Sequence, residues 1–275
     1  SYLDASTPVF IDEIFLKLYH LIVLVMHGIQ WIDFTLFLQL YFCGYFVKLA
    51  ILFLIQVFNN RLSLSFSFNK LDLKEMVSFG IYVLLSGTSV IIATRLDMIM
   101  IGALLDLKHV AFYTIAFYIG SAIKVPTKSI IYIAVPLLAK AWEEQDFKQI
   151  KTIYSKSSIN PLIVGGLFFL CVWINIDAIF SILPEKFSDG KWVVFYIGLA
   201  QLFSVASGVN GAIIVNSKYY RYDLITNVIL LCMTLYGNWI FIPESSPLSV
   251  YGIVGINGAA FATSLSIFLF TLTRL

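Results

Sequence analysis

Eight runs of about 20 apolar residues are the feature that most constrains how this chain folds, because such a run is long enough to cross a membrane as a helix. The runs span residues 13–29, 34–58, 74–104, 110–138, 158–183, 192–215, 224–242 and 251–271. Hydrophobic residues make up 60% of the chain and charged residues only 12%. Strands of a transmembrane barrel alternate apolar with polar residues, whereas these runs are continuously apolar. The sequence therefore predicts an all-α, polytopic membrane helix bundle.

Basic residues outside the runs are distributed unevenly, which predicts the orientation of the spans. If the first span starts in the cytoplasm, eleven of the 18 Lys and Arg fall in inside loops and ends, three fall in outside loops, and four lie within spans. Both ends of the chain are therefore predicted to be cytoplasmic. We interpret the long inside segment 140–157, which carries both charge signs, as a solvated connector. The alternative is a helix that extends beyond the membrane.

Charged residues inside the predicted spans indicate a polar pathway, because an ionisable side chain at the bilayer centre costs about 2.5–3.5 kcal/mol. Lys124 lies near the middle of its span, and the nearby Pro126 frees a backbone carbonyl. Lys128 and Arg95 lie nearer the span ends, where long side chains reach the interface. Lys48 lies in the second span. We therefore expect Lys124 to be the main functional cation of this pathway.

Asp97 is the carboxylate that the same argument singles out. It follows Arg95 by two positions, which places the two side chains about 200° apart around a helix, so they do not form a simple neighbouring pair. Asp97 either pairs with a cation on another span or binds a proton or cation as a desolvated carboxylate. Both alternatives stay open. No metal site is expected, because the cysteines and histidines show neither CxxC nor HExxH spacing.

Polar residues form stripes along three of the predicted spans. The stripes are Ser121, Lys124, Lys128 and Tyr132; Gln201, Ser204, Gly208 and Gly211; and Asp223, Asn227, Thr234 and Asn238. Intervals of three and four residues place each set on one side of a straight helix. Such faces either enclose a wet cavity or form hydrogen bonds between helices, and the sequence leaves both interpretations open for the neutral residues.

The order of several motifs resembles a known family. The motifs are RLDMIMIGALLDLKHVAFYTIAFYIG, KVPTKSIIYIAVPLLAKAWEEQD, NSKYYRYDLITNVILLCMTLYGNWIFIP and YGIVGINGAAFATSLS. Together they are similar to the polysaccharide flippases of the multidrug/oligosaccharidyl-lipid/polysaccharide exporter superfamily. More narrowly, they resemble the O-antigen flippases of lipopolysaccharide biosynthesis. Such proteins carry two six-helix lobes around a central cavity and move an undecaprenyl-pyrophosphate-linked glycan across the bacterial inner membrane.

The resemblance implies a domain organisation. Residues 1–58 would be the last two spans of the first lobe, residues 59–73 a cytoplasmic linker between lobes, and residues 74–275 the complete six-helix second lobe. The chain starts at Ser1 with neither an initiator methionine nor the features of a signal peptide. We therefore expect a fragment, with four further spans before Ser1.

The resemblance also implies roles for individual residues. Lys124 and Lys128 would receive the pyrophosphate, Arg95 would lie on the outer path and Lys48 in the partial first lobe. The remaining site residues would be Gln201, Asn210 and Asn227 facing sugar, and Asp97 coupling transport to H⁺ or Na⁺. No catalytic residue, cofactor or nucleic acid is expected, and the other partners are membrane lipids.

Two classes of alternative remain from the sequence. A multidrug or peptidoglycan-precursor exporter of the same superfamily would share the scaffold. A membrane-embedded glycan polymerase or acyltransferase would use similar lipid-linked substrates, but should show clustered acid, base or nucleophile residues in a large loop. The predicted outside loops are short, which favours a transporter over an enzyme.

Overall fold

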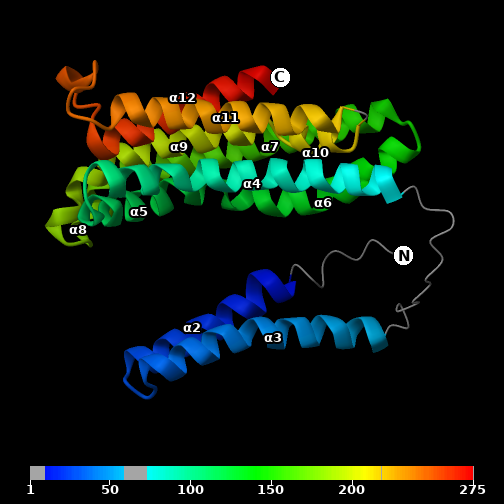
Figure 1. Cartoon of the computed structure of the whole chain (residues 1–275), viewed down its shortest axis with the longest axis horizontal. Coiled ribbons are helices and arrows are strands. Elements are labelled where there is room, and N and C mark those ends of the chain that lie inside the picture. The colour runs from blue at the N-terminus through cyan, green and yellow to red at the C-terminus, as the bar shows by residue number, and fades with distance from the viewer. Residues whose placement is uncertain (1–9, 59–72, 218, 275) are drawn as a thin grey trace. The chain divides into compact units, whose positions relative to one another are not determined.

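The computed structural model describes residues 10–58, 73–217 and 219–274. Its chain divides into two compact units, Ser1–Leu71 and Asp72–Leu275. Every regular element in the described part is helical (Figure 1), which confirms the prediction of an all-α membrane bundle. The predicted linker, 59–73, falls almost entirely on residues 59–72, which lie outside the described residues.

The first unit is a helical hairpin. A π-helical turn, η1 (Ile11–Phe15), leads into α2 (Leu16–Gly28), which packs along α3 (Phe34–Phe58). The Tyr19 hydroxyl donates to the carbonyl of Leu40 at 2.9 Å. The His20 ring stacks on Tyr41 with centroids 4.0 Å apart. Polar and aromatic contacts between neighbouring helices therefore hold this pair together where lipid supplies no hydrophobic driving force.

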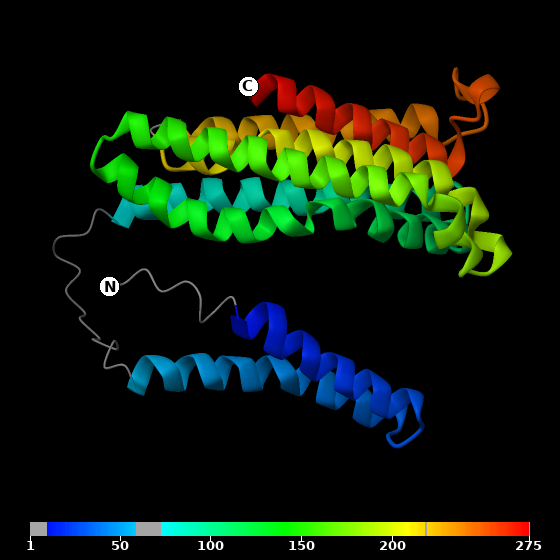
Figure 2. The ribbon, with the colours of Figure 1, turned by 180° about the vertical axis from the view of Figure 1, so that it is seen from behind.

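The second unit contains the remaining helices. They are α4 (Leu73–Leu104), α5 (Leu107–Ser121), η2 (Ala122–Lys124), α6 (Val125–Glu143), α7 (Phe147–Ile174), α8 (Ile176–Ser181), η3 (Glu185–Gly190), α9 (Lys191–Ala206), α10 (Asn210–Val215), α11 (Tyr220–Phe241), η4 (Ser249–Tyr251) and α12 (Gly255–Arg274). Helix α11 packs against α4 and α12, and α9 packs against α12, α5 and α7. Figure 2 shows α7, α9 and α12 from behind. Helix α6 pairs with α7.

Five continuous helices of the described part are long and apolar enough to cross a membrane: α3, α4, α7, α11 and α12. The pair α5 and α6, bent by 51°, would make a sixth. All eight predicted runs are helical, but the first contains the short α2, 13 residues long, and the sixth is divided between α9 and α10. Hydropathy detects apolar length and is insensitive to helix breaks, which is why the prediction counted eight full spans.

The bend between α5 and α6 corrects the prediction that Ser121, Lys124, Lys128 and Tyr132 share one face of a straight helix. The chain passes through a 3-10 turn at Ala122–Lys124, so the direction of the helix changes in the middle of the stripe. Pro126 stands in the first turn of α6, where its missing N–H costs no helical hydrogen bond. Proline therefore begins the second helix of this broken span.

The segment 140–157 is not the solvated connector that we favoured from sequence. Helix α6 continues to Glu143 and α7 begins at Phe147, so a short turn joins two helices. The Asp146 carboxylate caps α7 by accepting from the backbone N–H of Gln149 at 2.9 Å. The structure instead contains the alternative, because α6 and α7 both extend as helices beyond the predicted apolar runs.

A capped turn also joins α4 to α5. The Asp106 carboxylate accepts from the backbone N–H of His109 at 2.8 Å and lies 2.7 Å from its ring Nδ1. The hydrogen bond from the backbone N–H of His109 lowers the pKa of Asp106 below its usual value. A charged cap therefore fixes the start of α5 and the position of the residues that follow it.

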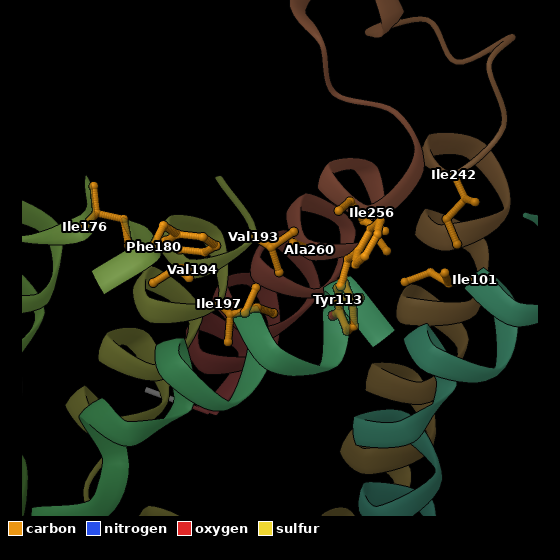
Figure 3. Packing of buried hydrophobic residues seen from close by; sticks show 13 residues of the cluster. Ile101, Tyr113, Ile176, Phe180, Val193, Val194, Ile197, Ile242, Ile256 and Ala260 are labelled. Carbon is orange, nitrogen blue, oxygen red and sulfur yellow. The ribbon is translucent and has the colours of Figure 1, made fainter. Parts of the chain in front are cut away.

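A hydrophobic cluster fills one end of the second unit. Its buried members come from α4, α5, α8, α9, α12 and the residue after α11, and include Ile101, Val193, Ile197 and Ile256. Figure 3 shows Tyr113 of α5 pointing into this packing beside Ile256. The cluster therefore fixes the ends of the helices that carry the polar side chains described below.

The orientation of the second unit can be tested with two single cysteines in a cysteine-free, full-length protein. Lys148 lies at the start of α7 and Ser188 in η3, and both are exposed. Helix α7 has 28 residues, about 42 Å, so the two positions are at opposite ends of a span. We expect Lys148→Cys to react from the cytoplasmic side and Ser188→Cys from the opposite side. Labelling of both cysteines from one side would contradict the predicted topology.

Candidate substrate and ion sites

The helix break at Lys124 is held in place by its neighbour Ile123, which is fully buried. A Cβ added at Gly165 of α7 would lie 3.5 Å from Ile123 Cγ2, and one added at Gly198 of α9 would lie 2.9 Å from its Cδ1. Gly198 therefore leaves the space that the end of Ile123 occupies, and Gly165 lies at ordinary contact distance from it. Since Ile123 is anchored in this way, the 3-10 turn has a fixed position against α7 and α9.

Lys124 is half-buried at this break and reaches α9. Its ammonium Nζ donates to the hydroxyl Oγ of Ser204 at 2.9 Å. Three residues further on, Thr127 is only 2% exposed, and its hydroxyl has no hydrogen-bond partner among the described residues. A cation and a buried hydroxyl therefore occur together at one broken span, the arrangement in which membrane transporters bind polar or charged ligands.

A second break follows Ser204 on α9. Helix α9 ends at Ala206 and α10 begins at Asn210. Gly208 adopts φ of +55°, and a Cβ there would lie 2.9 Å from Ser157 Oγ, so this close approach to α7 requires glycine. The Ser158 hydroxyl donates to the carbonyl of Ala206, and the backbone N–H of Val209 donates to Ser157 Oγ at 3.3 Å. Two serines of α7 thus satisfy the backbone groups that the break frees.

Asp97 is the centre of a separate polar site. It is 1% exposed and lies between α4, α5, α11 and α12. Tyr113 Oη donates to Oδ2 at 2.5 Å, and Asn238 Nδ2 donates to Oδ1 at 2.8 Å. The Thr263 hydroxyl lies 2.7 Å from each carboxylate oxygen. One helix therefore supplies the carboxylate and three others supply its neutral hydrogen-bond donors.

The alternative in which Asp97 pairs with a cation of another span is wrong for the described part of the chain. No Lys, Arg or His there forms a salt bridge with it. The amide oxygen of Asn238, which is fully buried, has no hydrogen-bond partner among the described residues either. A buried carboxylate beside an unsatisfied oxygen is an arrangement that favours a bound proton or small cation.

Three helices repeat polar residues at an interval of eleven residues. The pairs are Ser86 and Asp97 on α4, Asn227 and Asn238 on α11, and Thr263 and Arg274 on α12. Eleven residues are close to three helical turns, about 16 Å, so each pair lies on one side of its helix. The interface of these helices therefore contains two polar layers, one centred on Asp97 and one nearer the opposite end.

The second layer is built around an ion pair. Arg274 Nη2 lies 2.6 Å from Asp223 Oδ1, and the two side chains are 9% and 11% exposed. Ser86 donates to the same carboxylate, and Asn227 Nδ2 donates to Asp223 Oδ2 at 3.1 Å. Arg274 also donates to Thr226 Oγ1 at 2.6 Å. Helices α4, α11 and α12 are therefore connected by charge-assisted hydrogen bonds.

The asparagines predicted to face sugar are engaged in this second layer. Asn227 is 4% exposed and donates to Ser86 Oγ at 2.7 Å. The side-chain amide of Asn210 donates to the backbone carbonyl of Arg274. Both asparagines therefore form hydrogen bonds between helices, which is one of the two interpretations that the sequence left open for the polar stripes.

The other predicted site residues are dispersed. Lys48 forms an ion pair with Asp12 in the first unit. Arg95 is exposed on α4, with Nη1 4.0 Å from Met98 Sδ. Gln201 is half-buried on α9, one turn before Ser204. Lys128 lies in α6, and its side chain is outside the described part of the structure. Lys124 thus lies at the break between α5 and α6, and Gln201 lies on α9 shortly before its break.

Two important residues were not identified from sequence. Tyr113 is fully buried beside Asp97, and Ser86 joins α4 to the ion pair. A tyrosine in an aromatic-rich span carries no signal of its own. Ser86 would have been found from the interval of eleven residues that links it to Asp97.

Three comparisons relate this chain to known proteins. A family model described as polysaccharide biosynthesis protein matches residues 40–187, just over half of the chain. No curated protein matches the sequence. The fold is similar to the crystal structure of a mutant MATE protein, with a TM-score of 0.66 and 15% identity, and 86% of this chain covers 53% of that one. This similarity shows the fold, and the chain spans about half the length of that structure.

Proposed function

Because this chain belongs to the polysaccharide biosynthesis protein family, we propose that it is part of a flippase for an undecaprenyl-pyrophosphate-linked oligosaccharide or polysaccharide repeat unit. The flippase moves this lipid across the bacterial inner membrane during the synthesis of lipopolysaccharide, including O-antigen, or of another surface polysaccharide. Both ends of the present chain face the cytoplasm. Movement of a lipid between leaflets makes and breaks no covalent bond, so the protein needs no catalytic residue.

The observation that carries this proposal is the half-buried ammonium of Lys124 at a broken span. A pyrophosphate headgroup is strongly anionic, and its passage through lipid requires cationic partners with hydrogen-bond donors nearby. A discontinuous helix supplies such a place within a membrane, because its freed backbone groups are held by protein rather than exposed to lipid. Lys124 therefore receives the pyrophosphate in this proposal.

Other residues have supporting roles in the same proposal. Lys128, four residues after Lys124, provides a second cation for the pyrophosphate. Arg95, exposed on α4, lies on the outer part of the path, and Lys48 contributes from the first lobe. Gln201 faces the sugar. We assign Asn210 and Asn227 to helix packing, because their amides donate to protein acceptors.

Two lobes that rock against each other would expose the site alternately to either side of the membrane. In this proposal residues 1–58 belong to the first lobe, residues 74–275 form the second, and residues 59–73 connect them. The packed interface of α4, α11 and α12 favours movement of the second lobe as a rigid body, because its two polar layers tie these helices together.

Asp97 couples this movement to a gradient of H⁺ or Na⁺ in the proposal. Only neutral groups among the described residues donate to its buried carboxylate. An unpaired carboxylate at this depth is expensive, and a bound proton or sodium ion would remove the uncompensated charge. Binding and release of that cation therefore change the stability of the α4, α5, α11 and α12 junction.

Transport by the full-length protein in vesicles tests both parts of the proposal. The wild type should move a polyprenyl pyrophosphate that carries one fluorescent sugar, and a proton or sodium gradient should accelerate the movement. Asp97→Asn removes the ionisable group at constant size, so we expect the gradient-driven rate to fall at least about tenfold while substrate affinity stays within about twofold.

The matched control is Asp177→Asn, because Asp177 is an exposed carboxylate paired with Lys191. This variant should transport like the wild type. Unchanged gradient dependence in Asp97→Asn would assign Asp97 a structural role. Absence of transport by the folded wild type would refute the flippase function itself.

A further inference from the structure

We infer that Ser204 is a positioning residue that holds the ammonium of Lys124 in place for the phosphate groups of the substrate lipid, an inference that rests on the proposed function. Ser204 Oγ accepts from Lys124 Nζ at 2.9 Å, across 80 residues of sequence. The two residues belong to different broken spans, which this hydrogen bond joins. Ser204 has no charge of its own with which to bind an anion, so it acts through Lys124.

The geometry of α9 explains why Ser204 has a fixed position. It is the third residue from the end of α9, directly before the break. The Ser207 hydroxyl donates to the backbone carbonyl of Ser204 at 2.7 Å, and Ser158 of α7 holds the carbonyl of Ala206. Because Gly208 lies against Ser157 without space for a Cβ, the end of α9 cannot slide along α7. The Ser204 hydroxyl is therefore presented from a rigid support.

The backbone of Lys124 has a fixed position, whereas its side chain is long and flexible. Ile123 anchors the 3-10 turn between Gly165 and Gly198, but a lysine side chain has four rotatable carbons. The hydrogen bond to Ser204 therefore limits the positions that the ammonium can occupy. The Ser204 hydroxyl accepts a hydrogen bond from one of the three N–H groups of the ammonium. This bond restricts the position of the ammonium and still allows it to donate to an anion. Preorganisation of this kind increases affinity because less side-chain freedom is lost on binding.

The chemical class of ligand follows from the same donors. The ammonium of Lys124 and the buried hydroxyl of Thr127 are both hydrogen-bond donors. The oxygens of a phosphate accept several such bonds at once, and bonds from charged donors are the strongest. Ser204 thus determines the affinity for the phosphate part of the lipid rather than the choice of sugar.

The experiment uses the full-length protein in vesicles and the polyprenyl pyrophosphate that carries one fluorescent sugar. Ser204→Ala should raise the substrate concentration for half-maximal transport about tenfold, the effect of losing a hydrogen bond to a charged group, and leave the maximal rate within about twofold. Ser204→Thr keeps the hydroxyl and should restore most of the affinity. Ser181→Ala, the matched control, should resemble the wild type, because Ser181 is an exposed serine at the end of α8 whose hydroxyl donates to the carbonyl of Ala178 in its own helix.

A double-mutant cycle separates this inference from the proposed function. The cycle measures binding of the fluorescent lipid, because Lys124→Ala is expected to abolish transport. If Ser204 acts through Lys124, the variant with both Ser204→Ala and Lys124→Ala binds this lipid no more weakly than Lys124→Ala alone. Wild-type affinity in Ser204→Ala with lost transport in Lys124→Ala overturns the role of Ser204 and leaves the function standing. Normal transport in Lys124→Ala refutes both. If Ser204→Ala does not reach the membrane, Ser204→Cys replaces it, because cysteine is close to serine in size but is a weak hydrogen-bond acceptor. Wild-type affinity of Ser204→Cys for the lipid would likewise overturn the role of Ser204.

Discussion

Replacing Asp223 with asparagine is expected to lower the free energy of unfolding by about 3–5 kcal/mol, because the change leaves the Arg274 guanidinium buried without its anion. The two side chains are only 9% and 11% exposed, and their closest atoms lie 2.6 Å apart. Ser86 and Asn227 also donate to the Asp223 carboxylate, so an amide nitrogen in place of one oxygen puts two donors face to face. Loss of the pair therefore affects α4, α11 and α12 together.

Thermal or denaturant unfolding of the purified full-length protein in detergent measures this effect. Asp177→Asn is the matched control, since it removes one partner of the exposed pair with Lys191 and should change stability by less than about 1 kcal/mol. Asp223→Asn combined with Arg274→Gln should recover part of the loss, because no unpaired buried charge remains. Equal stability of Asp223→Asn and Asp177→Asn would show that the buried pair does not hold the second layer together.

The helices were predictable because hydropathy alone identifies stretches that must satisfy their backbone groups internally. The runs that became α3, α4, α11 and α12 are therefore close to the observed helices. The breaks were not predictable in this way. Ser207 and Gly208 interrupt their apolar run only briefly, so hydropathy averaged over the run does not reveal the break. The bend at Ala122–Lys124 depends on how Ile123 packs against α7 and α9. Such contacts join residues that are far apart in sequence.

The sites were predictable where a charge made them conspicuous. Asp97 and Lys124 stood out because ionisable groups are costly in apolar runs. Their partners are neutral residues, and Asn238 and Thr263 lie 141 and 166 positions from Asp97. Sequence periodicity placed Asn227 on a polar face but could not distinguish a cavity wall from a helix interface. The contacts of Asn227 with Ser86 of α4 and Arg274 of α12 resolve that choice.

Replacing Lys124 with alanine is expected to abolish surface glycan while the protein still reaches the membrane in normal amount. The ammonium lies half-buried at a break in a span, a position whose cost is compensated when it binds an anion. Its removal leaves the fold intact, because Ile123 continues to anchor the turn. Lys124→Arg keeps the charge but presents a larger, planar head, so it should retain part of the activity.

Complementation in a strain that lacks its own flippase measures whether the Lys124 ammonium is needed to move the lipid-linked glycan. The full-length wild-type gene should restore surface polysaccharide, and Lys124→Ala should not, although a membrane immunoblot shows equal protein. Lys148→Ala, which removes an exposed lysine at the start of α7, serves as the matched control and should restore surface polysaccharide fully. Normal surface polysaccharide in cells that carry Lys124→Ala would contradict the account, because the pyrophosphate would then cross the membrane without the cation assigned to receive it.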